Sequence, residues 1–183
     1  MRRARALAGS VALCVVLLSA ATAQTDAPPE PDGYRMQDYR ARVPATLRGA
    51  TVLDTAAALA LWKEGASVFV DVLPRVSKPA NLPAGTVWRD PRHESLPGAI
   101  WLPNTGYGVL GAAADAYFRH GLEKASKGDM NVQMVFFCQR DCWMSWNAAR
   151  RALDYGYRRV AWFPDGTDGW AEAGLPLRLV EPE

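Results

Sequence analysis

The sequence predicts a single α/β domain with a mostly parallel sheet and helices on both faces of that sheet. Short apolar segments rich in β-branched residues alternate along the chain with longer segments of helical periodicity. Strands that alternate with helices form parallel sheets, because each helix carries the chain back across the sheet before the next strand begins. The 183 residues, of which 49% are hydrophobic, are enough for one ordinary domain.

The first half of the predicted domain contains three strands and one helix. A short strand is expected at 51–53, after which Asp54 or Thr55 can cap the helix AAALALWKEG, which ends at Gly65. The apolar segment SVFVDVL at 67–73 is typical of a strand that is buried on both faces. A long loop rich in Pro, Gly and charged residues is predicted at 74–92. A third strand is predicted at 99–102.

The second half repeats the alternation. Residues 112–125 form an expected helix, because their apolar side chains gather on one face and their charged side chains lie elsewhere. The strand expected at 134–137 runs straight into Cys138. The last elements are a helix over 147–155, whose first turn begins around Ser145, and a strand over 159–163.

The chain begins with features of a secretory signal peptide over residues 1–23. Three arginines precede an uncharged apolar run, and the small residues Ala-Thr-Ala favour cleavage after Ala23. The apolar run is shorter than the ~20 residues that a membrane-spanning helix needs, so an uncleaved anchor is disfavoured. We therefore expect a periplasmic protein without a membrane anchor. Residues 24–50 read as a leader that could pack on the domain at 51–180.

Cleavage changes both the charge and the cysteine count. Removing the three arginines turns 21 basic against 19 acidic residues into 18 against 19, a formal net charge of −1. A balance so close to zero argues against nucleic acid as a partner. Cys14 is also removed, which leaves Cys138 and Cys142. Two cysteines this close together in an exported protein are a candidate redox pair.

The chemistry is predicted to concentrate in the loop that follows Cys138. In parallel α/β sheets, ligands bind where the strands end and the loops to the next helices begin. Backbone N–H groups and the helix dipole favour a thiolate there, and the thiolate is the nucleophile. Arg140 adds positive charge, whereas Asp141 opposes it. Cys138 is therefore the predicted nucleophile.

Cys142 admits two interpretations. A cysteine four residues away can attack a persulfide or sulfenate on Cys138 and leave a disulfide. Alternatively the pair forms a static disulfide that only staples the loop. The pair has no matching second pair of ligands, so neither a metal site nor a cofactor is predicted.

Further residues are candidates for binding substrate. Trp143 could form a flat aromatic wall, although Trp in a small domain is more often part of the core. Arg75 can line the mouth of the site and attract an anion. Asp71 is expected to anchor a neighbouring loop, and His93 to lie at the solvated surface. The predicted substrate-binding set is Gln139, Arg140, Asp141, Trp143, Met144 and Arg75.

Four separate motifs together resemble the rhodanese superfamily over about 130 residues. They are FVDVLPR at 69–75, LPGAIWLPN at 96–104, VFFC at 135–138 followed by SWNAA at 145–149, and the closing segment at 159–177. The resemblance implies that Cys138 forms a persulfide and that the amides of residues 139–144 surround it. Related phosphatases place an Arg where this chain has Met144, so phosphatase activity is not expected.

A narrower resemblance involves the signal peptide, the Cys142-Trp143 pair, MSWNAARRAL and PDGTDGW. These features are similar to the exported PQQ-dependent catabolism-associated CXXCW motif proteins, although three residues separate the cysteines here instead of two. The resemblance implies a link to a periplasmic quinoprotein dehydrogenase system.

Two functions follow as hypotheses. One is a sulfurtransferase-type or thiol-redox protein that acts on a small sulfur donor or acceptor or on a thiol partner protein. The other is a non-catalytic accessory domain with a structural disulfide.

Overall fold

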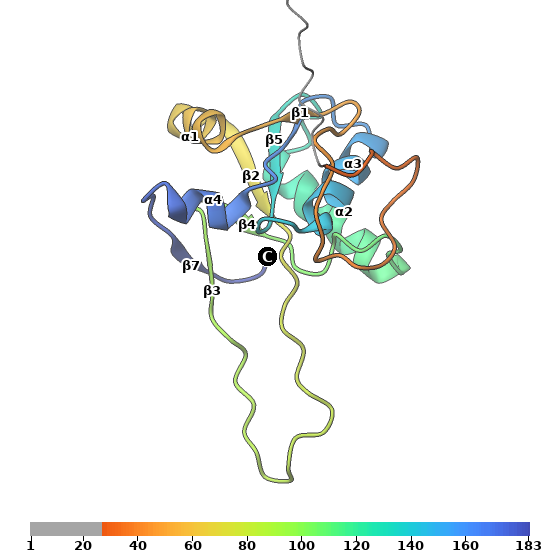
Figure 1. Cartoon of the computed structure of the whole chain (residues 1–183), viewed down its shortest axis with the longest axis vertical. Coiled ribbons are helices and arrows are strands. Elements are labelled where there is room, and N and C mark those ends of the chain that lie inside the picture. Colours follow the sequence, from red (N-terminus) through yellow and green to blue (C-terminus); the bar gives the residue numbers. More distant parts are fainter. Residues whose placement is uncertain (1–26) are drawn as a thin grey trace, which may run out of the picture.

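A five-stranded parallel sheet forms the centre of the protein in a computed structural model, which describes residues 27–183 (Figure 1). The strand order is β1-β6-β5-β2-β4, so the strand that leads to Cys138 occupies the middle. The strands are β1 (Thr51–Val52), β2 (Ser67–Asp71), β4 (Ile100–Trp101), β5 (Gln133–Phe137) and β6 (Val160–Trp162). The predicted α/β class with a mostly parallel sheet is confirmed. The predicted signal peptide falls outside the described residues.

Helices cover both faces of the sheet, as predicted (Figure 1). Helices α1 (Thr55–Glu64) and α4 (Gly166–Glu172) lie on one face, and α2 (Ala112–Ser126) and α3 (Trp143–Asp154) lie on the other. Successive side chains of a strand point to opposite faces. Accordingly Met134 and Phe136 of β5 join the core beneath α2 and α3, while Val135 and Phe137 join the core beneath α1 and α4.

Helix α1 begins and ends as the sequence predicts. The Asp54 side chain accepts a hydrogen bond of 2.8 Å from the backbone N–H of Ala57, and Gly65 closes the helix in the left-handed region with φ 69°. Helix α3 instead begins at Trp143, two residues before the predicted start near Ser145. Its first turn therefore follows Cys142 directly, and the loop between the cysteines is short.

Three elements were not predicted. Helix α4 has only seven residues, among them Gly166 and Gly169, and glycine disfavours helix. Strands β3 (His93–Ser95) and β7 (Arg178–Val180) form a separate antiparallel pair of three residues each. Runs this short show too little alternation to be recognised in a sequence.

Residues 27–50 pack along α3 with hardly any regular secondary structure of their own. We call this segment the N-terminal extension. The buried side-chain amide of Asn147 exchanges two hydrogen bonds of 2.9 Å with the backbone of Arg35. The indole N–H groups of Trp143 and Trp146 donate to the carbonyls of Arg42 and Thr46 at 3.0 and 3.1 Å. Side chains of α3 thus satisfy backbone groups of the extension, which needs no strand or helix for this purpose.

The long loop predicted at 74–92 is present and projects far from the body of the protein (Figure 1). It joins β2 to β3, and its base lies next to the carboxyl end of β2. Within residues 27–183, no helix has the length and apolar character needed to cross a membrane.

We predict that Asn147→Ala destabilises the protein by about 2–3 kcal/mol, because it leaves two backbone groups of Arg35 and the carbonyl of Gly106 without their partner. Urea unfolding followed by tryptophan fluorescence measures the change. Asn131→Ala, at an exposed turn, is the matched control and should change stability by less than about 0.5 kcal/mol. Equal effects of the two substitutions would contradict the role given to Asn147.

Candidate functional site

Cys138 lies at the carboxyl end of β5 and is completely buried. Its carbonyl accepts two hydrogen bonds from Thr167, from the backbone N–H at 2.9 Å and from the hydroxyl at 3.2 Å. The chain of Gly166 passes so close that a Cβ atom there would lie 2.3 Å from the same carbonyl oxygen. The start of α4 therefore fixes the backbone of Cys138 at the end of the central strand.

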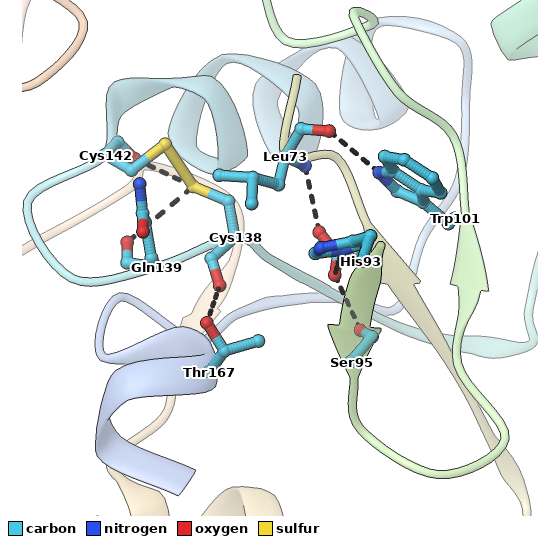
Figure 2. A network of polar contacts seen from close by, with 9 residues as sticks. Leu73, His93, Ser95, Trp101, Cys138, Gln139, Cys142 and Thr167 are labelled. Atoms are coloured by element: carbon cyan, nitrogen blue, oxygen red, sulfur yellow. Dashed lines mark hydrogen bonds and ion pairs between the residues drawn. A yellow bond between two sulfur atoms is a disulfide. The ribbon is translucent and has the colours of Figure 1, made fainter. Parts of the chain in front are cut away.

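A disulfide joins Cys138 to Cys142 across the loop that follows β5 (Figure 2). The two Cα atoms lie 6.5 Å apart, within the roughly 4.4–6.8 Å that a disulfide spans. Asp141 makes the turn between them with φ 54°, a left-handed conformation that Asp tolerates better than most residues. Both cysteines are buried, with exposed fractions of 0% and 2%.

Backbone groups of this loop bond outward in the disulfide state. The N–H of Arg140 donates to Asp168 at 3.1 Å, and the N–H of Trp143 donates to the carbonyl of Tyr39 at 2.9 Å. The sulfur of Cys138 faces carbonyl oxygens instead, at 3.5 Å from that of Cys142 and 3.7 Å from that of Gln139 (Figure 2). A disulfide sulfur has no proton to donate, so these contacts become hydrogen bonds only after reduction. Two of the amides expected to surround a persulfide are thus occupied by other partners.

Arg140 is held by acidic residues at α4. Its guanidinium forms a bidentate ion pair with Glu172 at 2.6 and 2.7 Å and contacts Asp165 at 3.1 Å. The hydrogen bonds that Arg140 donates to Glu172 and then to Asp165 raise the pKa of Arg140, and the bond that Glu172 accepts from Arg140 lowers the pKa of Glu172. This charge was expected to favour a thiolate on Cys138, but acidic residues of α4, a helix that was not predicted, pair with it instead.

A pocket of about 310 Å³ opens beside Cys142. It brings together four of the predicted site residues, namely Arg75, Gln139, Cys142 and Met144. Sequence reasoning missed the other contributors, of which Tyr39 and Arg40 come from the N-terminal extension. No periodicity or motif in the extension marks these two residues. The remaining walls are Leu73, Pro74 and Val76, at the base of the projecting loop.

The remaining predicted residues lie elsewhere. Asp141 is exposed and, with Arg140, lines a different pocket of about 420 Å³ on the side of Pro164 and Asp165. Trp143 is only 2% exposed and packs edge-to-face on Trp146. Its indole is used to hold the extension, as described above. The structure therefore places Trp143 in the core, which was the alternative interpretation.

A buried carboxylate anchors the neighbouring loop. Asp71, at the end of β2, is fully buried and accepts hydrogen bonds from the hydroxyl of Ser95 at 2.6 Å and from the backbone N–H of Leu73 at 2.9 Å. His93 Nε2 lies 2.7 Å from the same carboxylate, and its ring packs against Trp101 at a tilt of 43°, with centroids 4.3 Å apart. Asp71 anchors a loop as predicted, whereas the expectation that His93 is solvated is wrong.

In the part of the chain that the structure describes, no three His, Cys, Asp or Glu side chains group together in a way that could hold a metal ion.

Comparisons with known proteins give structural similarity only. No protein-family model and no curated protein sequence matches the chain. A protein of unknown function from Rhodopseudomonas palustris CGA009, described as a possible tyrosine phosphatase, is 23% identical with a TM-score of 0.46, over 70% of this chain and 85% of that one. A polysulfide-sulfur transferase homodimer from Wolinella succinogenes is 19% identical with a TM-score of 0.44, over 71% and 79%. An uncharacterized protein from Saccharomyces cerevisiae is 14% identical with a TM-score of 0.40, over 68% and 93%.

We predict that Gly166→Ala destabilises the protein by about 2 kcal/mol or more, because the new Cβ would meet the carbonyl of Cys138 and the residue has φ 49°. Chemical denaturation of the oxidised protein measures the loss. Gly33→Ala is the matched control, since nothing lies within 4 Å of a Cβ there. If Gly166→Ala unfolded at the same denaturant concentration as this control, α4 would not be what fixes the backbone of Cys138.

Proposed function

We propose that this protein handles sulfane sulfur through Cys138 and Cys142 in the manner of a rhodanese-like sulfurtransferase with a redox-active cysteine pair. The observation that carries the proposal is that the two cysteines lie at the carboxyl end of the central strand and are close enough to be bridged, and that one of them, Cys142, lines a pocket. Ligands of parallel α/β sheets bind at that end of the strands. The rhodanese-like motifs at 69–75, 96–104 and 135–149 support the same assignment.

The proposed reaction begins with the reduced pair. The Cys138 thiolate attacks the outer sulfur of a donor such as thiosulfate, the bond between the two donor sulfurs breaks, and sulfite leaves with the electron pair. This step produces a persulfide on Cys138. The Cys142 thiol then attacks the inner sulfur of that persulfide, and hydrosulfide leaves with the thiol proton. The product is the Cys138–Cys142 disulfide, which an external thiol must reduce before the next turnover.

The short loop between the cysteines favours a reactive disulfide over a purely structural one. A disulfide stabilises a fold chiefly by restricting the unfolded chain, and this effect shrinks as the closed loop becomes shorter. The two cysteines are only four positions apart. A loop of this size corresponds to roughly 2 kcal/mol of stabilisation in the chain-entropy description. The helix, the strand and the extension that surround the loop hold it independently of the bond.

We further infer that the protein is exported to the periplasm and serves PQQ-dependent alcohol catabolism. The signal-peptide pattern over residues 1–23 supports export, and the Cys142-Trp143 pair with PDGTDGW supports the narrower family. The partner would be a small sulfur donor or acceptor, or a thiol protein of a quinoprotein dehydrogenase system.

A non-catalytic accessory domain is the second candidate. The complete burial of Cys138 favours it, since a nucleophile must be reached by its substrate. In that case the disulfide would persist, and the protein would act only through its surface.

We expect reduced Cys142→Ser protein, incubated with thiosulfate, to gain the mass of one sulfur atom on Cys138, because no second thiol is present to resolve the persulfide. Intact-protein mass spectrometry measures the gain. Cys138→Ser, the matched control, should gain nothing. Wild-type protein should instead release sulfide and re-form the disulfide. Reduced Cys142→Ser protein that stays unmodified would exclude persulfide chemistry and favour the accessory domain.

Reduction of the wild-type disulfide should lower the free energy of unfolding by roughly 2 kcal/mol and leave the fold intact, given the length of the closed loop. Urea unfolding with and without a dithiol reductant, followed by circular dichroism, measures the difference. A loss above about 4 kcal/mol would exceed what a loop of this size explains, and would identify the bond as a structural staple.

A further inference from the structure

We infer that an external thiol attacks Cys142, and not Cys138, when the disulfide is reduced, and that the pocket beside Cys142 favours thiols that carry a negative charge. This inference rests on the proposed function, for which it supplies the step that regenerates the reduced pair. It also divides the roles of the two cysteines: Cys138 carries the sulfane sulfur, and Cys142 exchanges with the reductant.

Access to the two sulfurs differs. Cys142 forms part of the pocket wall, whereas Cys138 does not line that pocket and has no exposed surface. The Cys138 carbonyl is covered by Thr167, and its sulfur faces the carbonyl oxygens of Gln139 and Cys142 (Figure 2). Carbonyl oxygens repel an approaching thiolate. Because thiol–disulfide exchange depends on which sulfur can be reached, the pocket directs the attack to Cys142.

The charge of the pocket selects the attacking thiol. Its lining is mostly apolar and includes Leu73 and Met144, and two arginines, Arg40 and Arg75, also line it. The Arg40 guanidinium donates to the carbonyl of Arg140 at 2.8 Å and has no carboxylate partner among the described residues. Arg75 lies 3.8 Å from the exposed Asp90, a loose pair that solvent screens. The positive charge of Arg40, together with that of the loosely paired Arg75, attracts thiolates and thiols with a carboxylate toward the disulfide.

The exchange balances as two displacements. A thiolate of the reductant attacks the sulfur of Cys142, the bond between the cysteines breaks, and its electron pair goes to Cys138, which leaves as a thiolate. The product is a mixed disulfide on Cys142. A second reductant thiolate attacks the reductant's sulfur in that mixed disulfide and releases Cys142 as a thiolate. The net change is reduction of the pair and oxidation of two small thiols to their disulfide.

The site of attack can be mapped because Arg140 separates the two cysteines for trypsin. Oxidised full-length mature protein is mixed with 3-mercaptopropionate, quenched with acid, alkylated with iodoacetamide and digested. We expect the mercaptopropionate adduct on the peptide over 141–150 and the alkyl group on the peptide over 128–140. The reverse pattern would overturn the inference. So would a native protein that forms no adduct while the urea-unfolded protein forms one.

The charge preference has its own measurement. Each rate is divided by that thiolate's rate on a small-molecule disulfide, which removes the difference in intrinsic nucleophilicity. At equal thiolate concentration, 3-mercaptopropionate should then react faster than the cationic cysteamine, and added salt should reduce the difference. Arg40→Gln and Arg75→Gln should each slow the anionic thiol by about two- to fivefold, the effect of roughly 0.5–1 kcal/mol for an exposed charge. Arg178→Gln, an exposed arginine outside the pocket, is the matched control. Equal rates for the two thiols would overturn the preference for anions.

The outcome is independent of the test for persulfide formation. An adduct on Cys142 in a protein that takes no sulfur from thiosulfate would contradict the proposed function and support the inferred attack on Cys142. A persulfide on Cys138 together with an adduct on Cys138 would keep the proposed function and remove this inference.

Discussion

The burial of α3 on almost all sides determines how the cysteines are held. Nine of its residues are buried, among them every residue from Trp143 to Ala149. A helix with so little exposed surface cannot rest on a sheet alone, because the sheet covers only one side of it. The N-terminal extension covers the other side, anchored by the amide of Asn147 and the indoles of Trp143 and Trp146. Because α3 begins directly after Cys142, the same packing fixes one end of the cysteine loop.

The other end of the loop is fixed from the opposite face of the sheet. The first residues of helix α4 lie beside the end of β5, where Thr167 donates hydrogen bonds to the carbonyl of Cys138. Its acidic side chains then hold Arg140 in the middle of the loop. The cysteine pair is thus positioned by one helix from each layer of the fold, and each helix uses contacts that do not involve the sulfur atoms.

The sequence was sufficient for the regular parts of this arrangement and not for the irregular ones. The central strand, the alternation of strands and helices, and the cysteine pair follow from hydrophobic periodicity and spacing, which report on regular structure. The extension is held by individual hydrogen bonds between side chains and backbone, as at Arg35, and such bonds leave no repeating pattern. The glycine-rich α4 is formed by tertiary contacts against its own propensity. Because α4 was not predicted, the partners of Arg140 were not predicted either. Tyr39 and Arg40 belong to this extension. Their place in the pocket was not predicted, because no repeating pattern in the sequence shows where the extension packs.

The outward hydrogen bonds of the cysteine loop bear on how the protein changes oxidation state. Arg140 and Trp143 give their N–H groups to Asp168 and Tyr39, which lie outside the loop. The acceptors of these two bonds include neither sulfur atom. Breaking the bond between the cysteines therefore removes no partner from these N–H groups, so the backbone at Arg140 and Trp143 keeps its anchors while the two sulfur atoms are freed.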